Sequence, residues 1–98
     1  MKRNYYISKN GTLQRKDNSL NFKIEDGDHK YIPVEDVDSL YIFGEVTLNT
    51  KLINFLSQNG VILHFFNYYG FYTGTFYPKE KLKIYEDEVL NSSIEIED

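Results

Sequence analysis

Two histidines and a small group of acidic residues are the side chains in this sequence with the potential to do chemistry. Paired carboxylates can hold magnesium or transfer protons. The densest acids in the body of the chain are Glu35, Asp36, Asp38 and Glu45. Their spacing, around the ends of expected strands, is more typical of solvated turn and cap residues. We therefore assign no catalytic role to these four acids.

The histidines do not indicate a metal centre, because a metal site needs convergent ligands with suitable donors. His64 lies in an apolar run without an acidic neighbour, so we favour a packed, hydrogen-bonded core residue. His29, beside Asp28 and Asp26, is interpreted as part of a solvated turn rather than a weak metal site. The chain has no cysteine. We predict no catalytic residue, no metal ligand and no cofactor in this chain.

Aromatic residues form the most informative cluster, with eight of them in the 13 residues from 65 to 77. Each such ring buries roughly 150–250 Å², and a small core has little room for all of them. Plain core packing is one interpretation, and stacking on nucleic-acid bases is disfavoured because no basic residue lies between Lys51 and Lys79. We favour a partner interface. The interface candidates are Tyr68, Tyr69, Phe71, Tyr72, Phe76 and Tyr77.

A loose group of basic residues near the N-terminus gives a weaker signal. Lys2, Arg3, Arg15 and Lys16 are candidates for contacts with DNA phosphates, together with Lys9. A solvated strand face explains the same residues without a function, and we prefer that interpretation. DNA binding by this chain alone is not expected.

The charge of the sequence is uneven. Residues 1–78 hold eight Lys/Arg and eight Asp/Glu, whereas residues 79–98 hold three Lys and seven Asp/Glu. The whole net charge of −4 therefore lies in the last part of the chain. A neutral body with an acidic tail lacks the basic face that is typical of nucleic-acid binders. The length of 98 residues predicts one domain, and no apolar run is long enough to span a membrane. The simplest expected location is the cytoplasm.

The elements that position these residues centre on residues 39–78. Residues 40–43 are an apolar strand candidate, and Asn49 or Thr50 can cap the helix that follows. Asn59 and Gly60 end this helix, and residues 61–66 form an apolar strand that we expect to be buried on both faces. A strand–helix–strand unit predicts two parallel strands. Residues 71–77 should return antiparallel, with a bulge or a close backbone approach at Gly74.

The first 34 residues read as a meander of short strands. Residues 4–8 and 12–16 should pair as a hairpin around Asn10 and Gly11. Residues 20–24 alternate between apolar and polar, and residues 30–34 follow with Pro33 at a strand end or sheet edge. We therefore predict an α+β fold, namely a small β-rich domain of short antiparallel strands with one βαβ unit around a single main helix.

Three segments of the sequence resemble a known family. They are NYYISKNGTLQRKDNSLNF, YIPVEDVDSLYIFGEV and LNTKLINFLSQNGVILHFFNYYGFYTGTFYP. Together they resemble the N-terminal domain of the CRISPR-associated integrase/endonuclease of spacer acquisition, particularly its type I-B branch, over roughly residues 3–80. The resemblance implies a β-rich domain that pairs with its copy in another subunit and precedes a larger helical domain.

The resemblance places the family's chemistry outside this chain. It implies a divalent-metal site, for Mg or Mn, made of a glutamate, a histidine and an acidic residue in the helical domain. After Pro78, Lys79 and Glu80 the family continues into that helical stretch, whereas this chain continues with KLKIYEDEVLNSSIEIED. No catalytic residue can be carried over, so the chain as such is not expected to be an enzyme.

The sequence thus predicts residues 1–78 as a β-rich dimerisation-type domain and residues 79–98 as an acidic tail that is partly ordered or disordered. A short helix over 82–90 and a strand over 92–96 are the ordered options. The predicted function is a non-catalytic dimerisation or scaffold domain in adaptation. The expected partner is a second copy or a full-length integrase. The alternative is a stand-alone regulator or anti-CRISPR protein that pairs with the integrase, or mimics DNA, and blocks it. A small independent nuclease is a third, disfavoured reading.

Overall fold

The computed structural model describes residues 1–78 of the chain. The predictions for residues 79–98, including the helix, the strand and the tail as a separate unit, lie outside the described residues. The elements in chain order are β1 (Arg3–Ile7), β2 (Gly11–Lys16), β3 (Ser19–Ile24), β4 (His29–Pro33), a 3-10 turn (Val34–Asp36), β5 (Val37–Ile42), β6 (Val46–Thr47), α1 (Thr50–Gln58), β7 (Ile62–Phe66) and β8 (Tyr72–Phe76).

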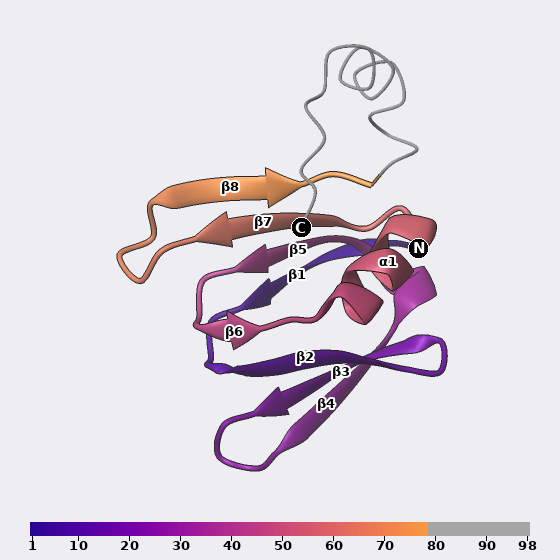
Figure 1. The fold of residues 1–98 in the computed structure, drawn as a ribbon, viewed down its shortest axis with the longest axis horizontal. Coiled ribbons are helices and arrows are strands. Elements are labelled where there is room, and N and C mark those ends of the chain that lie inside the picture. Colours follow the sequence, from indigo (N-terminus) through magenta and orange to yellow (C-terminus); the bar gives the residue numbers. More distant parts are fainter. Residues whose placement is uncertain (79–98) are drawn as a thin grey trace, which may run out of the picture.

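The strands form two mixed four-stranded sheets. Sheet A has the order β1-β5-β7-β8, and sheet B has the order β4-β3-β2-β6. Figure 1 shows the two sheets one above the other, with α1 at one end of them. Within residues 1–78, one α-helix and two mixed sheets make an α+β arrangement. Strands β5 and β7 pair in parallel, as the strand–helix–strand unit predicts. The pairs β1 with β5 and β2 with β6 are also parallel, so the expectation that the other strands are antiparallel was too narrow.

The predicted hairpin around Asn10 and Gly11 is wrong. Strand β1 pairs in parallel with β5 in sheet A, whereas β2 pairs with β3 and β6 in sheet B. The Asn10 side chain instead accepts a hydrogen bond from the Glu45 backbone N–H at 2.8 Å, and the Gly11 N–H donates to the Glu45 carbonyl oxygen at 3.1 Å. Asn10 and Gly11 therefore carry the chain from one sheet to the other.

Two later hairpins follow their local sequence signals. Strands β2 and β3 pair antiparallel around a turn in which Asp17 has a φ of 55°, a conformation that aspartate tolerates better than most residues. Strands β3 and β4 also pair antiparallel, and β4 ends at Pro33 on the edge of sheet B. A proline is acceptable there because its missing N–H is not needed by a neighbouring strand.

Helix α1 begins and ends as its sequence predicts. The Asn49 side chain accepts a hydrogen bond from the Leu52 N–H at 2.9 Å, which satisfies one of the free donors of the first turn. Gly60 follows the helix with a φ of 70°. Three apolar side chains of α1 are buried in the core: Leu52, Phe55 and Leu56. The helix therefore closes one end of the space between the sheets.

The core draws on both sheets and the helix. Leu40 and Leu63 of sheet A, Leu13 and Leu20 of sheet B, and Leu56 of α1 are all fully buried in one cluster. The expectation that residues 61–66 are buried on both faces was wrong. Leu63 is buried and Phe65 packs against the core, but His64 and Phe66 point to the other face and are only partly buried.

Strands β7 and β8 form a hairpin at the far edge of sheet A. Its turn projects beyond the ends of the neighbouring strands (Figure 1). The register shifts between Phe65 and Phe66, which face Gly74 and Tyr72, so Thr73 is the extra residue of a bulge. A Cβ atom added at Gly74 would meet nothing within 4 Å. The predicted bulge is confirmed, and the alternative of a close backbone approach is not.

Candidate partner interface

The outer face of sheet A carries a continuous set of ring side chains. Strand register explains the set, because Tyr6, Tyr41 and His64 lie directly opposite one another on β1, β5 and β7. Leu40 and Ile42 of β5 point inward, so Tyr41 and the following Phe43 point outward. We call this surface the aromatic face. Its members are Tyr6, Tyr41, Phe43, His64, Phe66 and Tyr72.

The rings of the aromatic face contact one another across strands. Tyr6 and Tyr41 stack with ring centroids 4.9 Å apart, and Tyr41 stacks on His64 at 4.6 Å. A second row places Phe43 and Phe66 at 4.5 Å. Tyr72 meets Phe66 edge-on at 5.9 Å. Such cross-strand ring pairs each contribute roughly 0.5–1.5 kcal/mol beyond simple burial. The rings therefore form one contiguous set of contacts across sheet A.

A short hydrogen-bond chain holds the β8 end of the aromatic face. His64 Nδ1 lies 3.1 Å from the Thr75 hydroxyl oxygen, which also contacts the Tyr72 hydroxyl. The predicted hydrogen bonding of His64 is therefore confirmed, but its ring lies on the outer face rather than in the core. The Thr75 hydroxyl therefore links the His64 and Tyr72 side chains, and Tyr72 is 61% exposed.

The turn between β7 and β8 presents three further exposed rings. Tyr68, Tyr69 and Phe71 are 91%, 80% and 70% exposed, and we call them the aromatic tip. Asn67 organises the backbone beneath them, because its side-chain oxygen accepts hydrogen bonds from the N–H groups of Tyr69 and Phe71 at 2.9 and 3.0 Å. Gly70 completes the turn with a φ of 86°. The tip is exposed yet held by its own turn.

Five of the six sequence-predicted interface residues are exposed, and the sixth packs against the core. Tyr68, Tyr69, Phe71, Tyr72 and Tyr77 are exposed large apolar residues. Phe76 instead packs against the core, since it pairs with Leu63 on the inner face of sheet A.

Of the aromatic face, the sequence-predicted interface residues include only Tyr72. Phe66 lies in the 65–77 cluster but was not an interface candidate, and His64 was expected in the core. Tyr6, Tyr41 and Phe43 were missed as well, since they lie far from that cluster. A usable signal was present in residues 40–43, where aliphatic Leu40 and Ile42 alternate with aromatic Tyr41 and Phe43. In a strand this alternation separates an aliphatic face from an aromatic face.

The basic candidates do not come together on one hairpin. Lys2 and Arg3 belong to the β1 end of sheet A, whereas Arg15 and Lys16 lie at the end of β2 in sheet B. The Arg15 guanidinium lies 4.3 Å from the centre of the Phe55 ring, and the Lys16 ammonium lies 5.6 Å from the centre of the Tyr31 ring. These cations pack on aromatic rings of their own chain.

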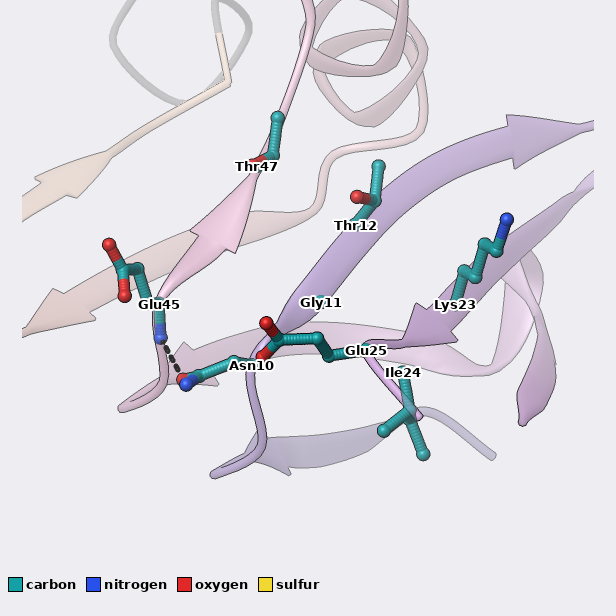
Figure 2. Close-up of a pocket in the computed structure, with 8 residues that line it drawn as sticks. All are labelled: Asn10, Gly11, Thr12, Lys23, Ile24, Glu25, Glu45 and Thr47. Atoms are coloured by element: carbon teal, nitrogen blue, oxygen red, sulfur yellow. Dashed lines mark hydrogen bonds between the residues drawn. The ribbon is translucent and has the colours of Figure 1, made fainter. Parts of the chain in front are cut away.

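A pocket of about 420 Å³ lies where β2, β3 and β6 meet, and Figure 2 shows its lining. Glu25 and Glu45 are its acids and Lys23 its cation, with Asn10 bonded to the Glu45 backbone between them. The Glu45 carboxylate points away from the Glu25 side chain (Figure 2). Within residues 1–78, no group of three or more His, Cys, Asp or Glu side chains is arranged to hold a metal ion. The pocket therefore offers no pair of convergent carboxylates.

Glu35, Asp36, Asp38 and Glu45 occupy the 3-10 turn, the start of β5 and the residue before β6. His29 lies at the exposed start of β4, where its Nδ1 is 3.3 Å from the Asn21 side-chain oxygen. Over the same described range, the search for a helix long and apolar enough to cross a membrane found none.

Comparison with known proteins supplies the family. Residues 5–87 match the model of the CRISPR associated protein Cas1 family. A CRISPR-associated endonuclease Cas1 of Thermodesulfovibrio yellowstonii is 57% identical over 79 residues, and that of Fusobacterium nucleatum is 52% identical over 80 residues. These matches cover 81% and 82% of this chain but 24% of each relative.

A solved structure gives the same result at the level of the fold. A CAS1 protein from Thermotoga maritima superposes with a TM-score of 0.76 and 49% sequence identity, over 82% of this chain and 25% of that one. The chain thus spans about a quarter of the length of the relatives it matches. From its sequence and its fold together, the chain belongs to the CRISPR-associated protein Cas1 family.

Proposed function

We propose that this chain is a non-catalytic pairing module of a spacer-acquisition integrase. In this role the aromatic face packs against the equivalent face of a second copy, or of a full-length integrase. Pairing then sets the positions of catalytic domains, which we place outside the described residues. The observation that carries the proposal is the aromatic face, whose six rings stack or meet edge-on on the outer side of sheet A.

The composition of this surface favours a protein partner. Tyrosine and phenylalanine are enriched in protein interfaces, where a ring supplies a large apolar area with few rotatable bonds. Contiguous apolar patches on a soluble surface are uncommon unless they bind something. Two flat sheets pack face to face about 10 Å apart, and the same patch can meet itself across a two-fold axis. A symmetric pair of such faces therefore buries both surfaces at once.

The region that this chain shares with its relatives is a small part of their length. Relatives described as endonucleases are about four times as long as the region they share with this chain. The resemblance noted in the sequence implies a Mg or Mn site in the helical domain of the full-length family. We propose that this chemistry resides there and that no cofactor belongs to the described domain. The alternative role as a regulator or anti-CRISPR protein gains no support from residues 1–78 or from the relatives.

Sedimentation and light scattering over a concentration series test the pairing. We expect a dimer whose dissociation constant rises at least tenfold in the Phe66→Ser/Tyr72→Ser double variant, because truncation of a central aromatic hot spot costs about 2 kcal/mol or more and about 1.4 kcal/mol corresponds to a tenfold change. Far-UV circular dichroism checks that the variant keeps its fold.

Tyr31→Ser is the matched control, since Tyr31 is 54% exposed but lies on sheet B. The control should dimerise like the parent chain. A parent chain that stays monomeric at every concentration, and that does not enter the peak of an added full-length Cas1 protein, would refute the proposed function.

A further inference from the structure

Within residues 1–78, each sheet has two edge strands with a free side, namely β1 and β8 in sheet A and β4 and β6 in sheet B. A free edge carries N–H and C=O groups that can accept another chain, so stable proteins blunt it. Strand β6 has only two residues, β8 carries a bulge at Thr73, and β1 begins at the cation Arg3 beside a register shift. Strand β4 has five residues in continuous register with β3, so it needs a different protection.

Lys30 is the residue of β4 that can supply this protection. It lies opposite Phe22, which is buried in the core, and opposite residues of a strand pair point to the same face of the sheet. Lys30 and Ile32 are therefore the inward-facing residues of β4. Ile32 packs against the core, whereas Lys30 is exposed at the open edge. An inward-pointing charge opposes strand addition, because the added strand would remove that charge from water.

The inner side of β4 has open space beside it. A crevice of about 530 Å³ is lined by residues of β1, β3 and β4, and Lys30 and Ile32 line it together with Ile7 and Ile24. Among the described residues, this lining holds no carboxylate that could pair with an ammonium group. An apolar side chain that enters the crevice would therefore meet apolar neighbours, whereas a second lysine would meet no opposite charge.

Apart from this charge, the pattern of β4 is complementary to a second copy of itself. In an antiparallel pair of two β4 strands centred on Tyr31, all residues of His29–Pro33 find a partner, and Lys30 of each copy faces Ile32 of the other. A two-fold axis makes both contacts equivalent. The two lysines then become diagonal neighbours about 7–8 Å apart on the inner face. We propose that β4 is able to pair with β4 of a second copy of this chain and that the Lys30 charge prevents this pairing.

Replacement of Lys30 in a chain with a disrupted aromatic face tests the proposal. The background is Phe66→Ser/Tyr72→Ser, so association through β4 is measured apart from association through the aromatic face. We expect Lys30→Val to raise the association constant by about tenfold or more over this background in sedimentation, because an apolar contact replaces a like-charge contact. Lys30→Thr, which is neutral and β-branched, should change it in the same direction. Far-UV circular dichroism at low concentration checks that each variant keeps its fold.

Two matched variants separate the charge at this position from a general gain in apolar surface. Lys30→Arg keeps the charge and should leave the association constant of the background unchanged. Lys23→Val makes the same exchange on β3, where Lys23 is exposed opposite His29 on the outer face of sheet B, and should also have no effect. Association of either control equal to that of Lys30→Val would overturn the proposal, as would a Lys30→Val chain that associates no more than its background.

Hydrogen exchange locates the contact within the molecule. In the Lys30→Val chain, the free-edge amides of residues 29–32 should exchange about fivefold more slowly above the dissociation constant than below it, because the second copy covers them. The amides of β8 should keep their rate. Slower exchange at β8 instead of β4 would overturn the assignment. The outcome does not depend on the proposed function, since each variant is compared with a background that lacks an intact aromatic face.

Discussion

At the scale of single residues, glycines show how the same residue type serves different physical needs. Gly70 and Gly60 adopt positive φ values, which a side chain would strain. Gly11 has an ordinary strand conformation, but a Cβ there would overlap the Lys23 carbonyl oxygen and lie 3.0 Å from the Phe22 ring. Gly11 is therefore required by the closeness of β2 and β3, not by a turn.

The first prediction compares two strand glycines. Gly11→Ala should lower the free energy of unfolding by about 1–3 kcal/mol, because the added methyl group has no space and the strand pair must shift. Gly74→Ala is the control, since a Cβ there meets nothing within 4 Å. It should change the stability by less than about 0.5 kcal/mol. Urea unfolding measures both, and equal effects would contradict the packing argument.

At the scale of elements, α1 has a clear local boundary that the rest of the fold uses. Its first turn depends on the Asn49 side chain, and its last turn passes into Gly60. Between them, the Phe55 ring covers the core on one side and contacts the Arg15 guanidinium on the other. The Asn49 cap therefore sets the residue at which α1 begins, and Phe55 of the same helix contacts Arg15 of sheet B.

Removal of the helix cap gives an element-level prediction. Asn49→Ala should lower the free energy of unfolding by about 1 kcal/mol, since the Leu52 N–H loses its partner. Asn54→Ala, at an exposed position of the same helix, removes an equal side chain without a cap and should be neutral or slightly stabilising. Thermal unfolding followed at 222 nm compares the two variants, and an Asn49→Ala midpoint equal to that of the parent would rule out the cap's contribution.

At the scale of the whole molecule, the two sheets share one core. Fully buried residues of sheet A, such as Leu63, and of sheet B, such as Leu13, belong to the same hydrophobic cluster. A shared core couples the sheets because neither can separate without exposing the inner face of the other. We therefore expect residues 1–78 to unfold in one cooperative transition.

Core truncations in the two sheets test this coupling. Leu63→Ala and Leu13→Ala should each lower the free energy of unfolding by about 2–5 kcal/mol. In each variant, circular dichroism and tyrosine fluorescence should report a single, coincident urea transition. Two separated transitions, or a loss of structure confined to one sheet, would show that the sheets are independent units.

Much of the local structure was predictable because its signals are local. The Asn49 cap, the Gly60 stop, the β2–β3 and β3–β4 turns and the bulge opposite Phe65 follow from neighbouring residues. Strand β6 escaped prediction because it has only two residues and pairs with the distant β2. The aromatic face was found only in part, since its members come from four strands and their shared side depends on register.

The sequence by itself determined the family, the helix with its ends, most strand positions and the richness in rings near residues 65–77. Only the tertiary structure decided that β1 pairs with β5 instead of β2. The physical reason is that this pairing places Ile7 and Ile42 side by side in the core. The apolar burial gained from this non-local pair outweighs the local preference of Asn10 and Gly11 for a tight hairpin turn. The same choice aligned Tyr6 with Tyr41 and so created the aromatic face.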